Sequence, residues 1–155
     1  MNNGYIHNQV LLHTVEQKFR VLGAEVTREY PVEAHGRRGF IDLHIKFPSW
    51  SLAAEAENAR RRVGWDINKA GAAGASGLII MAPTWQVARA CRDEVRQKRN
   101  RGDAGSLWIC VLTLGAFQQW FRINFPLFSP SFEASKTFPA SESGRTSTST
   151  PYSKL

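Results

Sequence analysis

Three carboxylates stand among apolar residues between Phe40 and Glu57, in the stretch FIDLHIKFPSWSLAAEAE. The alternation of apolar and polar residues predicts two adjacent β-strands. Because side chains alternate in direction along a strand, Glu55 and Glu57 share one face of the second strand, and Asp42 lies on the first. Carboxylates on apolar strands are costly to bury unless they are paired or bind a cation. The three acids therefore predict a site for a hard divalent metal, with Mg²⁺ expected and Mn²⁺ able to replace it.

The positive charge of the chain is concentrated directly after these acids. Residues 58–102 carry ten basic and three acidic side chains, a net charge of +7 that equals the formal net charge of the whole chain. A basic field beside a carboxylate cluster suits a polyanionic substrate, because Lys and Arg neutralise phosphates and release counterions. The alternative is a solvated basic helix surface without a ligand.

Five arginines are candidate contacts to nucleic acid: Arg37, Arg38, Arg60, Arg61 and Arg62. The last three directly follow the acids. They would either grip the phosphates that flank a cleaved bond or pair with the acids as an inert salt-bridge cluster. The first two lie in the glycine-bounded stretch HGRRG, which predicts a turn. There they would reach a groove or backbone of DNA, or simply form an exposed hairpin tip.

Length and composition predict one folded domain followed by a tail. A chain of 155 residues with 43% hydrophobic residues is long enough for one core. Residues 129–155 are rich in Ser, Thr and Pro and are expected to be disordered, which leaves residues 1–128 as the domain. Two Cys without CxxC spacing indicate neither a zinc site nor a disulfide scaffold. Without a membrane-length apolar run or a signal-peptide pattern, a cytoplasmic protein with no membrane association is expected.

Helix and strand patterns alternate along the domain. Apolar residues at helical spacing predict a first helix over 10–22, which Gly23 ends. Strands are expected at 25–33, 77–82 and 107–114. Two further strands are expected between 40 and 57, after a turn at 35–39 and on either side of a connection at 47–50. Helices are expected at 61–73, 85–101 and 116–121. This order predicts an α/β sandwich with a mixed central sheet flanked by helices.

The order of helix, three-strand meander, helix and strand resembles the αβββαβ core of the PD-(D/E)xK, or restriction-endonuclease-like, nuclease superfamily. The likeness covers residues 9–82, and the later helix and strand would extend the core. It implies that Asp42 and Glu55 hold one or two magnesium ions. It also implies that Glu16, on the first helix, belongs to the site, as a glutamate there does in some branches. The alternative for Glu16 is an exposed helix acid beside Lys18 and Arg20.

The chain departs from this superfamily at the motif lysine, because Glu57 stands in its place. Some members carry a second acid there, and others move the lysine to the following helix. Lys69 is therefore one candidate and Lys46, on the Asp42 face of its strand, is the other. In this interpretation Glu57 is a ligand or the base that orients the attacking water, and Lys69 stabilises that water or the scissile phosphate. If neither lysine reaches the site, the fold is expected without cleavage activity.

The resemblance implies a metal-dependent endonuclease that hydrolyses phosphodiester bonds in double-stranded or branched DNA. A homodimer is a candidate assembly because one site cuts one strand, and a separate targeting protein is a candidate partner because the domain leaves little room for recognition elements. Two alternatives stay open. One is a catalytically inactive nuclease-fold protein that binds DNA or a partner protein. The other is an unrelated α/β interaction domain whose acids and arginines neutralise one another.

Overall fold

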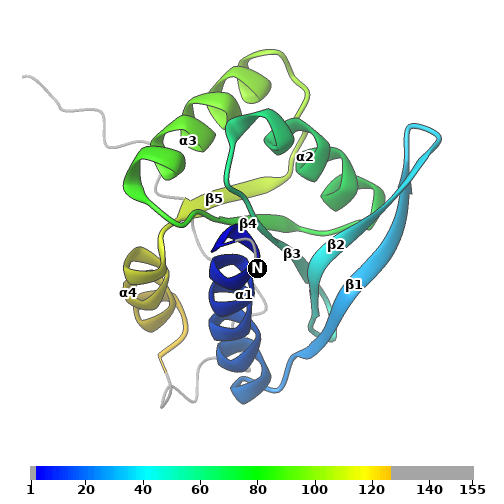
Figure 1. Ribbon diagram of the computed structural model, residues 1–155. Helices are drawn as coiled ribbons and strands as arrows, with labels where there is room; N and C mark the ends of the chain where they lie inside the picture. Colours follow the sequence, from blue (N-terminus) through cyan, green and yellow to red (C-terminus); the bar gives the residue numbers. More distant parts are fainter. Residues whose placement is uncertain (1–2, 127–155) are drawn as a thin grey trace, which may run out of the picture.

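Five strands form one mixed sheet in the computed structural model, which describes residues 3–126 (Figure 1). They are β1 (Glu25–Ala34), β2 (Arg37–Lys46), β3 (Ser51–Ala56), β4 (Gly77–Met81) and β5 (Trp108–Leu112). The strands lie in chain order in the sheet. The pairs β1–β2 and β2–β3 are antiparallel, and the pairs β3–β4 and β4–β5 are parallel. The prediction of an α/β protein with a mixed sheet flanked by helices is confirmed.

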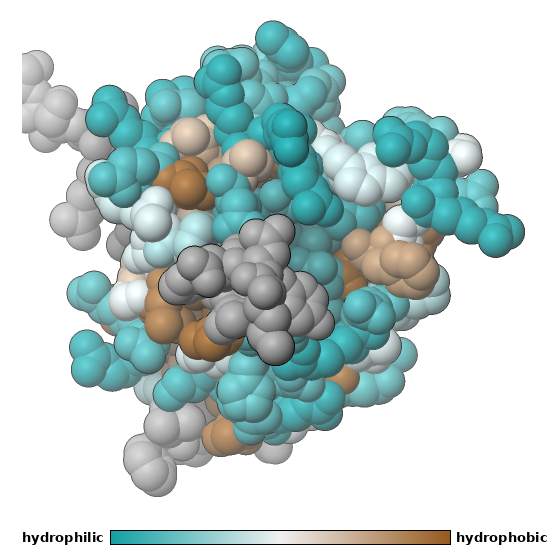
Figure 2. All heavy atoms as spheres, viewed as in Figure 1, coloured by the Kyte–Doolittle hydropathy of each residue, from teal (hydrophilic) through white to brown (hydrophobic). Residues whose placement is uncertain are grey.

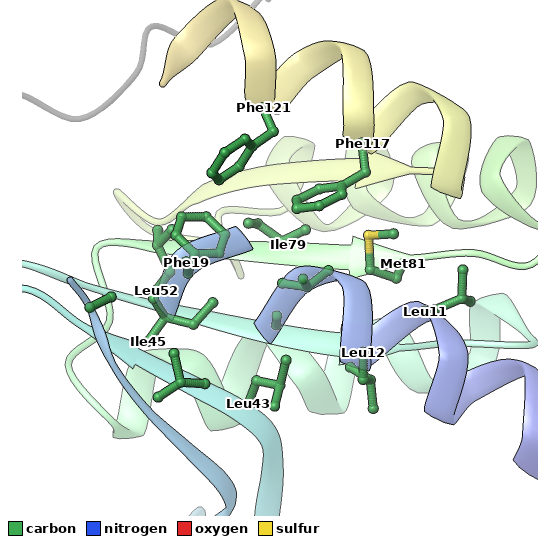
Figure 3. Packing of buried hydrophobic residues seen from close by; sticks show 14 of the residues in the cluster. Leu11, Leu12, Phe19, Leu43, Ile45, Leu52, Ile79, Met81, Phe117 and Phe121 are labelled. Carbon is green, nitrogen blue, oxygen red and sulfur yellow. The ribbon is translucent and has the colours of Figure 1, made fainter. Parts of the chain in front are cut away.

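Helices cover both faces of the sheet (Figure 1). One face packs against α1 (Asn3–Val21) and α4 (Leu114–Asn124), and the other against α2 (Val63–Ala72) and α3 (Trp85–Asn100). The first interface is rich in large aromatic side chains, with Phe19 of α1 5.3 Å from Phe121 of α4 between ring centroids (Figure 3). The second interface uses smaller residues, such as Ala53, Ala70 and Ala88, so α2 and α3 can lie close to the sheet.

Two element boundaries near the N-terminal half differ from the predictions. Helix α1 begins at Asn3 and not at Val10. The prediction missed its first turns because they are largely polar and carry no apolar period. Strand β2 begins at Arg37, inside the stretch predicted as a turn. The turn itself consists of His35 and Gly36, with φ of 50° and 71°. Positive φ at both residues is what a tight two-residue hairpin connection requires, and Arg37 and Arg38 consequently lie on a strand.

Boundaries nearer the C-terminus also differ, and α4 ends at Asn124 where residue 121 was predicted. Strand β3 ends at Ala56, so Glu57 directly follows the strand and is not part of it. A 3₁₀ turn, η1 (Arg60–Arg62), precedes α2 where a continuous helix was predicted. Leu114 begins α4 and does not end the last strand. Each difference falls at an element end, where local sequence patterns are least informative.

Strand β2 changes the face that it packs against at Asp42. Leu43 and Ile45 contribute to the core under α1 and α4, whereas Ile41 contributes to the core under α2 and α3. The pairing of β1 with β2 is interrupted at the same level, opposite Glu29, whose φ is 49°. The register is the same on both sides of this level, so Glu29 and Asp42 lie opposite each other without a ladder pair. Asp42 thus stands where β2 passes from one core to the other.

No helix within residues 3–126 is long and apolar enough to cross a bilayer. The predicted domain end at residue 128 and the predicted disordered tail at 129–155 lie outside the described residues.

Candidate functional site

A buried cluster of charged side chains lies between β3 and α2. We call Glu55, Glu57, Asp66 and Lys69 the Lys69 cluster, and each of the four is at most 2% exposed. The period of the helix explains why two members of this cluster lie together. Asp66 and Lys69 lie three residues apart on α2, on the stripe that also carries the buried Ile67 and Ala70 towards the sheet. An apolar helix face therefore brings two charged residues against the acids of the β3 end.

Lys69 connects three elements through its ammonium group. Its Nζ lies 2.6 Å from Glu55 Oε1 on β3 and 3.1 Å from Asp66 Oδ1 on α2. The same group donates a hydrogen bond of 2.9 Å to the carbonyl oxygen of Phe40 on β2. A lysine ammonium has three donors, so these partners account for its capacity. Lys46, the other candidate lysine, is exposed at the opposite end of β2, where it pairs with Ser51.

Asp42 stands beside the cluster where β2 and β3 separate. Strand β3 pairs with β2 only from Leu43 to Lys46, so Asp42 is the first residue past the last pair. Its Oδ2 accepts a hydrogen bond of 2.9 Å from the Ala56 amide on β3. The Asp42 carboxylate is also close enough to raise the pKa of Glu55. The structure thus brings Asp42, Glu55 and Lys69 to one place.

The acids of the cluster compete for too few positive charges. Burial raises the pKa of Glu55 well above its ordinary range, and the charges of Asp66 and Asp42 raise it further. Burial, with Asp66 beside it, raises the pKa of Glu57 to about 8. Burial also raises the pKa of Asp66, although the charge of Lys69 beside it lowers that pKa in part. Burial opposes the charge on Lys69, but Glu55 and Asp66 outweigh it, so the pKa of Lys69 is raised and the ammonium stays charged.

The donor chemistry of the site fits a magnesium ion. Glu55 and Asp66 contact Lys69, Glu57 contacts Arg62, and burial raises the pKa of all three carboxyl groups, so a cation among them would offset their mutual repulsion. Within residues 3–126, no group of three or more His, Cys, Asp or Glu side chains is arranged to hold a metal. The predicted trio of Asp42, Glu55 and Glu57 is therefore not assembled as a closed ligand set. Magnesium is commonly held by one or two carboxylates, with water and substrate phosphate completing its shell, and Asp42 with Glu55 supplies such a pair.

Glu16 has different partners. Its Oε1 accepts from Arg20 at 3.0 Å, and its Oε2 accepts from Arg28 at 2.8 Å. Burial would raise the pKa of Glu16, but hydrogen bonds from Arg28 and Arg20 outweigh it and hold the pKa below its ordinary value. Both oxygens are engaged on the α1 side, so this acid makes a buried ion-pair network where the sequence predicted a site residue or an exposed helix acid.

The five predicted DNA-contact arginines divide into two groups. Arg62 Nε lies 3.3 Å from Glu57 Oε1, which follows the salt-bridge alternative. Arg60 and Arg61 are exposed in the same 3₁₀ turn. Arg37 lies over the Trp65 ring, 4.9 Å from its centroid, and Arg38 is exposed beside it on β2. Hydrophilic residues dominate the surface over α2, α3 and the projecting hairpin (Figure 2).

Asp66 is the site residue that the sequence analysis missed. A signal for it exists, because Asp66 is three residues before Lys69 and lies between the apolar Val63 and Ile67. A charged pair on the apolar stripe of a helix predicts that both members are buried and need partners on the facing sheet.

Comparison with known proteins assigns no family to this chain: no protein-family model matches the sequence, and no curated protein matches it either. Its function therefore has to be argued from the Lys69 cluster and the surface around it.

The raised pKa of Glu57 predicts a stability that falls as pH rises. The folded state keeps a proton on Glu57 up to about pH 8, whereas the ordinary carboxyl releases it near 4.5. The folded state binds more protons than the unfolded state across this window, so the free energy of unfolding decreases from pH 5 to pH 8. We expect a loss on the order of 2–4 kcal/mol, measured by urea unfolding at several pH values.

Glu57→Gln should flatten this dependence because its amide does not titrate. Glu33→Gln, which changes an exposed acid of the hairpin, serves as the matched control. An unchanged pH slope in Glu57→Gln would show that Glu57 does not hold the proton.

Proposed function

We propose that this protein is a metal-dependent DNA endonuclease with a restriction-endonuclease-like core. The observation that carries the proposal is the buried contact of 2.6 Å between Lys69 Nζ and Glu55 Oε1, with Asp42 beside it where β2 and β3 separate. Two acids on neighbouring strands with one lysine are the residue types that the superfamily motif combines. Here the lysine comes from α2, and Glu57 takes the place of the motif lysine.

The element order supports the same proposal. Helix α1, the β1–β2–β3 meander, α2 and β4 follow one another in the order expected for such a core. Asp42 lies on the second strand of the meander and Glu55 on the third, as the resemblance requires. The parallel β5 and the helices α3 and α4 extend the sheet and its layers.

The side chains of the site divide the chemical work of phosphodiester hydrolysis. Bound magnesium would supply an activated water and neutralise charge on the phosphate. Asp42 and Glu55 are the residues that would hold it. Glu57, with a pKa of about 8, would carry its proton near neutral pH and could donate it as a general acid, whereas it would accept a proton as a base only after losing its own at higher pH. Lys69 fixes the position of the Glu55 carboxylate through its short ion pair.

DNA is the proposed substrate because of the charge around these acids. Arg60 and Arg61 are exposed in η1, and Arg38 is exposed on β2, so exposed positive side chains stand on two of the elements that adjoin the site. Arginines in such positions bind phosphates and fix the register of a nucleic acid. We keep double-stranded or branched DNA as the substrate, a homodimer as the assembly and a separate targeting protein as a further partner.

A catalytically inactive DNA-binding protein of the same fold is the second candidate function. This candidate is favoured because the acids are neutralised within the protein: Lys69 forms an ion pair with Glu55, and Arg62 lies 3.3 Å from Glu57. If the surface arginines were all paired with acids in the same way, the protein would be an α/β interaction domain without affinity for DNA.

Cleavage of supercoiled plasmid and of a branched DNA junction separates these functions. The purified protein is incubated with each DNA in Mg²⁺, Mn²⁺ or EDTA, and products are resolved on gels. Nicking or cutting that requires the metal supports the endonuclease. Binding of the same DNA without cutting in either metal would identify the inactive protein, and neither binding nor cutting would identify the interaction domain.

The salt dependence of DNA binding is expected to report Arg60 and Arg61. If each neutralises one phosphate, Arg60→Ala and Arg61→Ala should each make the slope of log K against log salt less negative by about 0.9. The measurement is anisotropy of a labelled duplex across a salt series in EDTA. Arg122→Ala removes an exposed arginine of α4, in the opposite layer, and should leave the slope unchanged. Equal slopes for all three variants would remove Arg60 and Arg61 from the DNA interface.

A further inference from the structure

The β1–β2 hairpin extends past the rest of the sheet. Strand β2 pairs with β3 from Leu43 to Lys46, and with β1 along its length except at Asp42, so residues 37–41 pair with β1 and not with β3. Figure 1 shows the hairpin projecting beside α2. Beyond Asp42 the hairpin is therefore a two-stranded arm.

Phe40 lies at the base of this arm with its side chain exposed. Its residue is 61% exposed, although it stands in a paired strand two residues before Asp42. Its carbonyl oxygen accepts the hydrogen bond of Lys69 Nζ at 2.9 Å. The backbone of Phe40 thus contacts the Lys69 cluster, while its ring is exposed to solvent.

The neighbouring aromatic residue is already engaged. The Trp65 ring carries Arg37 at 4.9 Å, and it lies so close to Gly39 that an added Cβ there would stand 3.0 Å from Trp65 Cζ2. Phe40 is therefore the exposed large aromatic of the arm within the described residues. The exposed Arg38 lies two residues away on the same strand, which combines a free ring with positive charge.

We propose that Phe40 stacks on an unpaired base of a DNA strand whose backbone crosses the Asp42–Lys69 site, so that the substrate is forked or branched DNA. An exposed ring beside arginines is the combination that binds unpaired bases, because every base offers a π-face and the arginines neutralise its phosphates. In a continuous duplex the bases are stacked on one another and offer no such face. The inference rests on the proposed function and assigns the DNA form that this site takes.

The test compares two labelled DNAs that differ in base pairing. One is a continuous duplex, and the other is the same duplex opened at one end into a fork. Binding is measured by anisotropy in EDTA, so cleavage is not needed. The wild type should bind the fork more tightly than the duplex. Phe40→Ala should weaken fork binding by roughly 5- to 100-fold, as expected for the loss of one stacked base, and change duplex binding less than twofold.

Three variants make the result specific. Phe40→Trp keeps a stacking ring and should retain the fork preference, whereas Phe40→Leu keeps apolar area without a ring and should lose most of it. Trp85→Ala removes an equally exposed aromatic, at 61%, from α3 and should leave the preference unchanged. Near-ultraviolet circular dichroism checks that each variant is folded.

The outcomes separate this inference from the proposed function. A fork preference that Phe40→Ala abolishes supports it, even if the protein cuts no DNA and the endonuclease proposal fails. Equal binding of fork and duplex, or a Phe40→Ala loss that is the same on both, overturns it while DNA binding and cleavage stand. Absence of all DNA binding overturns both.

Discussion

Asp42→Ala and Glu55→Ala are each expected to reduce metal-dependent plasmid cleavage by at least about 10³-fold. Metal-supplied charge stabilisation of a phosphoryl transition state is worth several kcal/mol, and each 1.4 kcal/mol is a factor of ten in rate. Asp42 and Glu55 supply the carboxylate pair at the separation of β2 and β3. The measurement is the initial rate of nicking of supercoiled plasmid in Mg²⁺.

Glu16→Gln is the informative control for this loss. Its carboxylate is engaged by Arg20 and Arg28 on the α1 side, so its replacement should change the cleavage rate only a few-fold. Cutting that survives both Asp42→Ala and Glu55→Ala would mean that the site is elsewhere. A loss in Glu16→Gln as large as in Glu55→Ala would return Glu16 to the site.

Lys69→Met is expected to lower the free energy of unfolding by about 3–5 kcal/mol, because removing one partner of a buried ion pair leaves the other charge uncompensated. Glu55 and Asp66 would both lose their ammonium partner, and the Phe40 carbonyl would lose its donor. Urea unfolding followed by circular dichroism at neutral pH measures the change. Lys46→Met replaces an exposed lysine of β2 and should stay within about 0.5 kcal/mol of the wild type.

A double variant identifies the cause of the destabilisation. Lys69→Met with Glu55→Gln removes the ammonium and the nearest carboxylate charge together, so part of the lost stability should return. A double variant as unstable as the sum of its parts would indicate lost packing of the lysine stem in place of lost ion pairing. A Lys69→Met protein as stable as Lys46→Met would contradict the buried ion pair itself.

Much of the fold was predictable because its signals are local. Apolar periods of the helix and strand type placed the elements in their correct order, and they put Asp42 on the second strand and Lys69 on the following helix. The boundaries failed where that signal is absent. Asn3 begins a helix whose first turns are polar, and Arg37 begins a strand directly after a two-residue turn that depends on positive φ.

The candidate site was predictable in its residue types and only partly in its contacts. Of the two candidate lysines, the structure brings Lys69 to the acids and leaves Lys46 at the far end of β2. Glu16 accepts a hydrogen bond from Arg28, twelve residues along the chain, and does not join the site. Asp66 enters the cluster although no motif position points to it.

By itself, therefore, the sequence determined the order of helices and strands, the basic middle segment and the presence of acids on two largely apolar strands, since composition and periodicity are properties of neighbouring residues. Only the tertiary structure decided which charge meets which. Ion pairs such as Lys69 with Glu55 form between elements, so they depend on strand register, on the separation of β2 and β3 at Asp42 and on how closely α2 packs against the sheet.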